Sequence, residues 1–539
     1  MNLRPASGGV HLPIDFAFVT RHSLAIAYFR PSKMNLLFFR PLPGVTLIAR
    51  VRWAFWLPVL AFSLYGLMVV RYSAACAAGS DSSGYLNNAR LLGHGTLVIP
   101  MRQLPGLDPK TLPSYTSVPL GFIPQPDGLT MVPTYPMGLP LLLLLTAQVV
   151  GWDLTPALTM AIQALLGLWL VYRLGRELGL ERGWAWTGPL LLAASPLYVY
   201  MSLALMSDVP ATVWVTATVL LAWKSRAQPG FAVLAGAAFS LALLLRPTDL
   251  LAIVPVAVAL GFSLRRWRLL AAGGLPGAAF LAVVNHATYG RLLTTGYGDI
   301  SSLLSIRNVP VTLVHYACWV PALFTPLVVL AVGLPAVRSV PRRAAVMLAG
   351  WILVFFLFYL FYEYTHQTWW YLRFILPAIP PLVVAALLVA RRLVGRLRLV
   401  PRAWWLALAL LVAVVFGRTW FRRLGLARLH DGEASYPTSA AWMRSHLPPG
   451  AVVAAMQTSG ALLYYTDFVF FRWDMVSTAD FQRIAAACAA AGRPLYALLY
   501  PFEIKDQGAF RQHLAGPWTQ IGEFHNASLW RYETAGTAP

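Results

Sequence analysis

Two aspartates stand where polar sequence meets apolar sequence, and each could do acid–base chemistry. Asp81 opens the run Asp81-Ser82-Ser83-Gly84-Tyr85, a few residues after the first long apolar stretch. Asp208 opens Asp208-Val209-Pro210, between two later apolar stretches. A positioned carboxylate can accept a proton from an attacking hydroxyl or amine, so we predict that both aspartates are catalytic. The alternative for each is a helix N-cap.

Two arginines, Arg246 and Arg373, lie at the ends of apolar stretches that we expect to share a membrane face with the two aspartates. A guanidinium group matches the oxygens of a phosphate, so both are candidates for binding a lipid phosphate. Each has an alternative. Arg246 could form only a local ion pair with Asp249. Arg373 follows Trp369-Trp370-Tyr371 and could snorkel from an interfacial aromatic belt.

The sequence has no spacing that is typical of a metal site or a nucleotide-binding loop. His286, His315 and His366 near the predicted outer face show no ligand pattern. There is no Walker loop, no dinucleotide fingerprint and no Ser-His-Asp order. The three cysteines make no disulfide framework. We therefore assign no metal ligands and no certain cofactor, and a divalent metal stays open.

The elements that carry these residues are membrane helices. Hydrophobic residues make up 58% of the 539 residues and charged residues only 12%, whereas a soluble domain has about 25% charged residues. This composition excludes a soluble enzyme and predicts an α-helical polytopic membrane protein. The net charge of +22 comes largely from basic clusters between the apolar stretches. Such clusters are typical of cytoplasmic loops, so we predict no binding of nucleic acid.

The apolar stretches predict eleven membrane crossings, since a crossing needs about 20 residues. The ranges are 53–73, 154–173, 184–203, 207–223, 230–246, 248–264, 268–286, 315–337, 344–362, 371–390 and 403–420. A shorter apolar run at 140–150 predicts a juxtamembrane or half-embedded helix. With the N-terminus inside, the inner segments hold 23 basic residues and the outer segments before residue 418 hold eight. The positive-inside rule therefore favours a cytoplasmic N-terminus and an outer C-terminus, although Arg418, Arg422 and Arg423 do not fit.

This topology divides the chain into three parts. Residues 1–52 form a cytoplasmic tail without a secretory signal, and either Met1 or Met34 is the start. Residues 53–424 form the transmembrane domain, with a long outer loop at 74–153 and a second at 287–314. Residues 425–539 form a small outer α/β domain, because short strands alternate there with helices. The expected elements are helices at 437–447 and 478–491, strands at 451–455, 468–471 and 495–500, and, in the first outer loop, a helix at 85–92 capped by Ser82 and Ser83.

In the order of its motifs the chain resembles the GT-C membrane glycosyltransferases, above all the family-39-like group. That group includes protein O-mannosyltransferases, lipid A aminoarabinose transferases and lipopolysaccharide galacturonosyl transferases. The matching segments lie within residues 75–420. They are Asp81-Ser82-Ser83-Gly84-Tyr85 with Ala89 and Gly93; Thr134-Tyr135-Pro136-Met137-Gly138; Ser195-Pro196 with Ser207-Asp208-Val209-Pro210; Asn285, Tyr289-Gly290 and Thr295-Gly296-Tyr297; and Leu372-Arg373-Phe374 with Pro377 and Pro380-Pro381.

The resemblance implies a polyprenyl-phosphate-sugar donor and an inverting hexosyl or pentosyl transfer at the outer face of the plasma (inner) membrane. The acceptor would be a lipid, a glycan or a protein, and the first-loop acid, here Asp81, would be the catalytic base. We assign Tyr85, Tyr135 and Tyr297, with the two arginines, to donor binding. Many relatives have a second acid near the first, where this chain has serines. Thr134-Tyr135-Pro136 also replaces the Glu-Lys-Pro of the aminoarabinose transferases, which removes a metal-ligand Glu and a phosphate-binding Lys.

Two other classes of protein stay open. A flippase or transporter of lipid-linked sugars would also be polytopic, with charges at the membrane edge. The sequence shows no inverted repeat and no paired broken helices, and transporters rarely need an outer loop of about 80 residues. A non-catalytic membrane scaffold with an outer α/β domain is the third class. Detection of glycosyl transfer distinguishes the three.

The predicted topology is testable with reporter fusions. Because basic residues concentrate on the inner side, a reporter fused after residue 424 should behave as exported. An alkaline phosphatase fusion at this point should be active and a green fluorescent protein fusion dark. The opposite pair of results would contradict both the topology and the assignment of Asp81 to the outer face.

Overall fold

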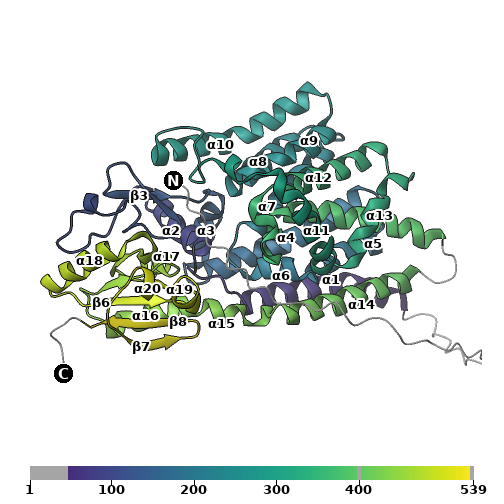
Figure 1. Ribbon diagram of the computed structural model, residues 1–539. Helices are drawn as coiled ribbons and strands as arrows, with labels where there is room; N and C mark the ends of the chain where they lie inside the picture. Colours follow the sequence, from purple (N-terminus) through teal and green to yellow (C-terminus); the bar gives the residue numbers. More distant parts are fainter. Residues whose placement is uncertain (1–45, 397–401, 534–539) are drawn as a thin grey trace, which may run out of the picture. The chain divides into compact units, whose positions relative to one another are not determined.

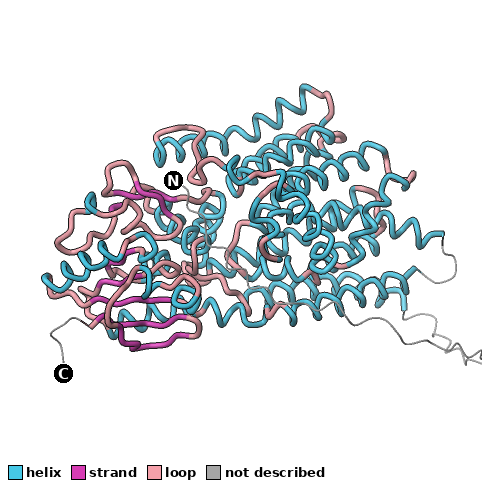
Figure 2. Tube along the Cα trace, viewed as in Figure 1, coloured by secondary structure: helices cyan, strands magenta, loops and turns pink. Residues whose placement is uncertain are grey.

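The computed structural model describes residues 46–396 and 402–533, which are mostly helical (Figures 1 and 2). By their contacts the residues fall into two units, 1–61 and 62–539. The described part of the first unit is the beginning of helix α1 (Thr46–Arg71). The predicted cytoplasmic tail therefore lies almost wholly outside the described residues, as does part of the basic cluster at 391–402.

In the second unit, helices stand at the predicted apolar ranges. They are α4 (Thr155–Glu177), α5 (Arg182–Ala193), α6 (Pro196–Leu203), α7 (Asp208–Lys224), α8 (Phe231–Leu245), η2 (Pro247–Ala252), α9 (Ile253–Leu260), α10 (Leu264–Tyr289), α11 (Val309–Phe324), η5 (Pro326–Ala336), α12 (Arg342–Leu360), η7 (Trp369–Ala378), α13 (Ile379–Arg396) and α14 (Arg402–Arg423), where η marks a 3-10 helix. Among the described residues, five helices are long and apolar enough to cross a membrane, or up to seven if each of two bent pairs is one crossing. The chain is thus a multi-pass membrane protein, and the number eleven stays a prediction.

Several predicted crossings are not continuous helices. The range 184–203 is divided between α5 and α6, because Ser195 is extended and the Pro196 that follows it cannot continue a helix. Helices α6 and α7 meet at 111°, and α11 and η5 meet at 107°. The second bend lies at Thr325, whose φ is +75° and which precedes Pro326. These two breaks were not predicted from the sequence.

The first outer loop begins with helix α2 (Asp81–Gly93), which starts earlier than predicted. Ser82 and Ser83 therefore lie inside its first turn and do not cap it, and the Ser83 hydroxyl donates back to the carbonyl of Gly79. Three strands follow in a small antiparallel sheet, with β3 between β1 and β2. They are β1 (Ile99–Pro100), β2 (Phe122–Pro124) and β3 (Thr130–Pro133). The short apolar run then forms α3 (Gly138–Val150), whose 13 residues span only about 20 Å.

The C-terminal part contains a five-stranded sheet in the order β5-β4-β6-β8-β7. Its strands are β4 (Val452–Ala454), β5 (Val469–Phe471), β6 (Leu495–Leu499), β7 (Trp518–Phe524) and β8 (Ala527–Tyr532), and its main helices are α16 (Ser435–His446), α17 (Ser459–Tyr465) and α18 (Thr478–Ala490). The first three strands are parallel, and β8 and β7 add antiparallel. Successive residues face opposite sides, so Val453 packs with α16 and α17, whereas Val452 packs with α18. A strand or helix stands at each predicted range, but the β7–β8 hairpin was not predicted.

Helix α17 of the C-terminal part lies against helix α2 of the first outer loop (Figure 1). Two segments that pack on one another must lie on the same side of a membrane. The chain therefore crosses the membrane an even number of times between residues 93 and 459. The crossings predicted between these residues are even in number, so the predicted topology meets this condition.

Candidate active site

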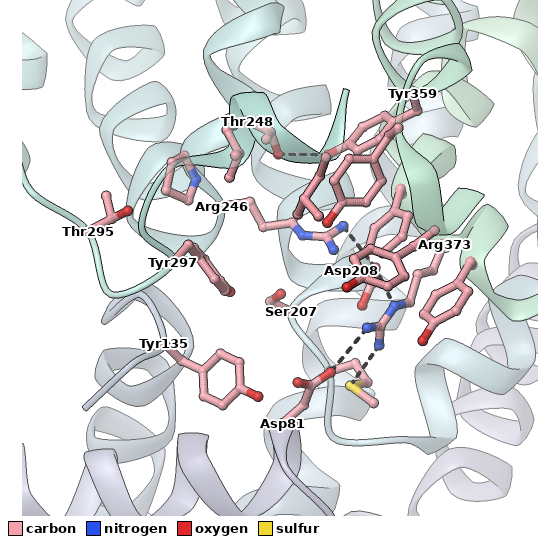
Figure 3. Close-up of a pocket in the computed structure, with 18 of the residues that line it drawn as sticks. Asp81, Tyr135, Ser207, Asp208, Arg246, Thr248, Thr295, Tyr297, Tyr359 and Arg373 are labelled. Carbon is pink, nitrogen blue, oxygen red and sulfur yellow. Dashed lines mark hydrogen bonds and ion pairs between the residues drawn. The ribbon is translucent and has the colours of Figure 1, made fainter. Parts of the chain in front are cut away.

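All seven residues that we assigned to the site from sequence line one cavity of about 720 Å³ (Figure 3). They are Asp81, Tyr85, Tyr135, Asp208, Arg246, Tyr297 and Arg373. They come from α2, the end of the first outer loop, α7, the end of α8, the second outer loop and η7. Asp81 and Arg373 alone are separated by 292 positions in sequence. The fold therefore assembles the candidate site from distant segments.

Each aspartate is the first residue of a helix, Asp81 of α2 and Asp208 of α7. The positive end of a helix dipole stabilises a carboxylate at this position. Ser80 and Ser207 stand at the N-cap positions, and neither makes a side-chain capping bond. The two carboxylates point into the cavity (Figure 3). The structure therefore does not support the alternative in which the aspartates are N-caps.

The two arginines pair with the two aspartates. Nη1 of Arg246 lies 2.8 Å from Oδ1 of Asp208, and Nη2 of Arg373 lies 3.1 Å from Oδ2 of Asp81. Nε of Arg373 is also 4.0 Å from Oδ1 of Asp208, so Arg373 stands between the two acids. Nη1 of Arg246 and Oδ1 of Asp208 are close enough to form an ion pair, but the geometry of the N–H groups does not make a hydrogen bond between them. Arg246 Nη1 and Arg373 Nε thus make no hydrogen bond within the described residues.

An aromatic wall of Tyr359, Tyr371 and Phe374 supports the arginines. The ring of Phe374 stacks on Tyr359 and on Tyr371, at centroid distances of 5.4 and 5.6 Å. The guanidinium carbons of Arg246 and Arg373 each lie 5.3 Å from the centroid of Phe374, within the range of a cation–π interaction. Arg373 is therefore held inside the cavity, and its guanidinium does not extend to the lipid surface as a snorkelling side chain would.

Three further tyrosines of the cavity, Tyr359, Tyr362 and Tyr364, were not predicted from the sequence. They cluster at the C-terminal end of the apolar range 344–362, and this density of tyrosines is the signal that could have indicated them. The Tyr359 hydroxyl donates to Oγ1 of Thr248 at 2.8 Å. The cavity therefore combines hydroxyl groups with apolar ring faces.

Tyr85, Tyr135 and Tyr297 form a second aromatic group at the same cavity. The ring of Tyr135 lies 5.1 Å from that of Tyr85 and 6.1 Å from that of Tyr297, between centroids. The Tyr85 hydroxyl donates to Oγ of Ser207 at 3.1 Å. Burial, followed by the negative charge of Asp81, raises the pKa of Tyr85 and the pKa of Tyr135. Both phenols therefore stay protonated at neutral pH.

Other charged residues that the sequence places at the outer face lie outside the cavity lining. Arg90 donates to the carbonyl of Tyr464 at 3.1 Å. Asp249 is buried, with 1% of its surface exposed. Nδ1 of His366 lies 3.4 Å from the hydroxyl of Thr312. Over residues 46–396 and 402–533, no three His, Cys, Asp or Glu side chains gather in a way that could hold a metal ion.

The two acids differ in accessibility, which separates what they can do. The Asp81 side chain is 24% exposed and the Asp208 side chain only 2%. A ligand in the cavity can therefore reach Asp81 directly. Asp208 lies deeper and is placed to hold the two guanidinium groups. The cavity thus offers one reachable proton acceptor and two guanidinium groups that line the same space.

No family model and no curated protein matches the sequence. Among solved structures, the chain is similar to ArnT from Cupriavidus metallidurans bound to undecaprenyl phosphate, with 15% identity over 89% of this chain and 99% of ArnT and a TM-score of 0.56. For ArnT in the apo state the identity is 15%, the coverage 90% and 98%, and the TM-score 0.55. The arabinofuranosyltransferase AftD from Mycobacteria is 16% identical over 88% of this chain and 40% of AftD, with a TM-score of 0.49. The likeness to ArnT establishes the fold, and it is the GT-C fold that the sequence resemblance implied.

The buried pair of Arg246 and Asp208 should show strong energetic coupling. Arg246→Met and Asp208→Asn each leave one charge without its partner, so each should lower the stability of the protein in detergent. The double variant should lose less free energy of unfolding than the two single variants lose in sum, and the difference should be about 0.5–3 kcal/mol. Unfolding of the four proteins measures this coupling. The exposed pair of Asp480 and Arg483, 3.3 Å apart, is the control, and strictly additive losses at the buried pair would contradict the prediction.

Proposed function

We propose that the chain is a membrane glycosyltransferase that moves a sugar from a polyprenyl-phosphate-linked donor to an acceptor at the outer face of the membrane. The observation that carries this proposal is the cavity in which Asp81 and Asp208 meet Arg246 and Arg373. A proton acceptor next to an anion-binding pair is what displacement of a lipid phosphate by a hydroxyl or amine requires. The acceptor is a lipid, a glycan or a protein.

Asp81 is the catalytic base in this proposal. Its carboxylate takes the proton of the acceptor hydroxyl or amine as the oxygen or nitrogen attacks the anomeric carbon. The bond between the anomeric carbon and the phosphate oxygen breaks, and the polyprenyl phosphate leaves with the bonding electrons. Attack from the face opposite the leaving group inverts the anomeric carbon. Asp81 suits this role because it is the more exposed of the two acids.

Arg246 and Arg373 bind the phosphate. Both guanidinium groups line the cavity and are held by the two aspartates and by the ring of Phe374. They are thus oriented before a ligand arrives, which reduces the ordering that binding must impose. A phosphate that develops charge as the sugar leaves would be stabilised by both arginines. The shared fold with ArnT, solved bound to undecaprenyl phosphate, supports this class of donor.

The bent pair α6–α7 favours transport of a lipid-linked sugar as a second candidate function. The break between these helices places Asp208 at the start of a half-helix, and broken helices at a central binding site are typical of transporters. Transport requires no proton acceptor and makes no new glycosidic bond. Reconstitution in liposomes therefore separates the two functions by whether product forms or intact donor changes leaflet.

Substitution of the acids tests the proposed base. Wild-type protein is incubated with a panel of undecaprenyl-phosphate-linked hexoses and pentoses and a membrane-lipid extract that supplies acceptors. Asp81→Asn should lower kcat by about 10²–10⁴-fold, and Asp208→Asn by a smaller factor, because Asp208 acts through the arginines. Asp127→Asn is the control, since Asp127 only caps a turn of the same outer loop. Wild-type kcat in Asp81→Asn would remove this residue as the base, and wild-type protein inactive with the whole panel would count against the function.

Substitution of the arginines tests phosphate binding. A charge-assisted contact to phosphate is worth about 1.5–3 kcal/mol, so Arg246→Ala or Arg373→Ala should raise the donor KM by roughly 10- to 150-fold. Arg373→Lys should recover little of this loss, because an ammonium group cannot make the bidentate contact with phosphate that a guanidinium group makes. The exposed Arg291 of the second outer loop lies outside the cavity, and Arg291→Ala should leave KM unchanged. An unaltered KM in both cavity variants would show that the phosphate binds elsewhere.

A further inference from the structure

The C-terminal helix α17 is attached to the helix that carries Asp81. Helices α2 and α17 lie side by side (Figure 1). The Asn87 side chain donates to the carbonyl of Gly460 at 3.0 Å and to the carbonyl of Ser83 at 2.9 Å. Arg90 lies over the other end of α17, with its guanidinium carbon 3.6 Å from the ring centroid of Tyr464. These contacts join the two helices along their length.

A second arginine of the first outer loop, Arg102, fixes the end of α17. Its guanidinium donates to four backbone carbonyls at and beyond the C-terminus of this helix, those of Leu462, Leu463, Thr466 and Phe468, at 2.7–3.4 Å. The last carbonyls of a helix have no partner within it, so a cation placed there satisfies them. The N-terminal end is held as well, because the Leu120 amide donates to Oγ of Ser459 at 3.0 Å. Helix α17 is thus held at both ends by the first outer loop.

The contact between Gly460 and Ser83 leaves no space between the two helices. A Cβ atom at Gly460 would stand 2.0 Å from Oγ and 2.8 Å from Cβ of Ser83. Ser83 is fully buried and lies in the first turn of α2, two residues after Asp81. Any side chain at residue 460 must therefore push α17 and the first turn of α2 apart.

The neighbouring residue on the first turn of α2 contacts the segment that leads to the second acid. The Ser82 hydroxyl donates to the carbonyl of Leu205 at 3.2 Å, three residues before Asp208. One turn further along α2, Tyr85 bonds to Ser207. The first turn of α2 is therefore enclosed between α17 and the α6–α7 break. The distance from Asp81 to Asp208 and the arginines depends on how closely this turn is packed.

We propose that α17 is a positioning element of the active site, and that Gly460 sets how far α2 carries Asp81 into the cavity. This inference rests on the proposed function, in which Asp81 is the base. Misplacement of a catalytic group by about 1 Å costs on the order of 10²-fold in rate. The phosphate-binding Arg246 and Arg373 belong to other elements, and of the residues assigned to donor binding only Tyr85 moves with α2, so a shift of α2 should change kcat much more than the donor KM.

Gly460→Ala tests this proposal, because its methyl group should displace the first turn of α2. We expect kcat to fall by roughly 10- to 100-fold while the donor KM changes less than about twofold. Ser83→Gly removes the two atoms that the methyl group meets most closely and leaves the Leu120 carbonyl oxygen at 3.1 Å, so Gly460→Ala/Ser83→Gly should recover most of the lost kcat. The binding stoichiometry of undecaprenyl phosphate, measured on each variant, normalises kcat to the folded fraction. Gly450→Ala, in the same C-terminal part but with only Arg493 near its added atom, should match the wild type.

The outcomes separate this proposal from the proposed function. Wild-type protein that transfers no sugar would overturn the function. An active wild type with unchanged kcat in Gly460→Ala, or a loss that Ser83→Gly does not restore, would overturn the positioning role alone. If Gly460→Ala does not fold, Asn87→Ala removes the link to Gly460 without adding volume. It should lower kcat several-fold at constant KM, and a wild-type kcat there would likewise overturn the positioning role.

Discussion

Burial of charge beside a lipid bilayer is the constraint that the candidate site must satisfy. Asp208 is 1% exposed, and removing an ion from water costs several kcal/mol even after the protein relaxes. Its carboxylate is stabilised by Arg246 at 2.8 Å, by the start of α7 and by the more distant Arg373. Asp208 itself begins α7, and the two arginines come from the end of α8 and from η7. This one buried acid therefore links three helical segments of the second unit.

The site is electrically balanced before any ligand binds, since two carboxylates face two guanidinium groups. An anion that enters the cavity must share cations that already have partners. Arg373 stands between Asp81 and Asp208, so a phosphate drawn to Arg373 would loosen its contact with Asp81. In the proposed reaction, binding of the donor phosphate to Arg373 would then free the Asp81 carboxylate from its ion pair, so this single side chain would link the two events.

Much of the site was predictable because charge is rare in this chain. Where only 12% of residues are charged, an acid or an arginine at the end of an apolar stretch is conspicuous, and Asp81, Asp208, Arg246 and Arg373 all line the one cavity. The positions of the helices were predictable for the related reason that long aliphatic runs must form them in lipid.

The remaining features depend on tertiary contacts. Tyr359 at the end of a membrane helix is not distinguishable by type from an interfacial anchor, and only the fold turns it toward the cavity. The break at Thr325 follows from a positive φ that the residue type does not indicate. The β7–β8 hairpin turns at His525, whose φ is +50°, without the Asn-Gly or Asp-Gly pair that marks such turns. The contact of Asn87 with Gly460 joins residues 373 positions apart, beyond the reach of any local pattern.

That separation also has a consequence for biosynthesis. Helix α2 leaves the ribosome early, whereas the helix that packs against it is made near the end of the chain. At about 5–20 residues per second, the 373 intervening positions take roughly 20–75 s to translate. During this interval the face of α2 that carries Ser83 and Asn87 lacks the helix that covers it in the finished protein, while the intervening helices are made and inserted. The packing of α17 on α2 forms only when the last part of the polypeptide arrives, so premature termination of translation would yield a protein whose cavity-lining residues are all present but whose α2 lacks this support.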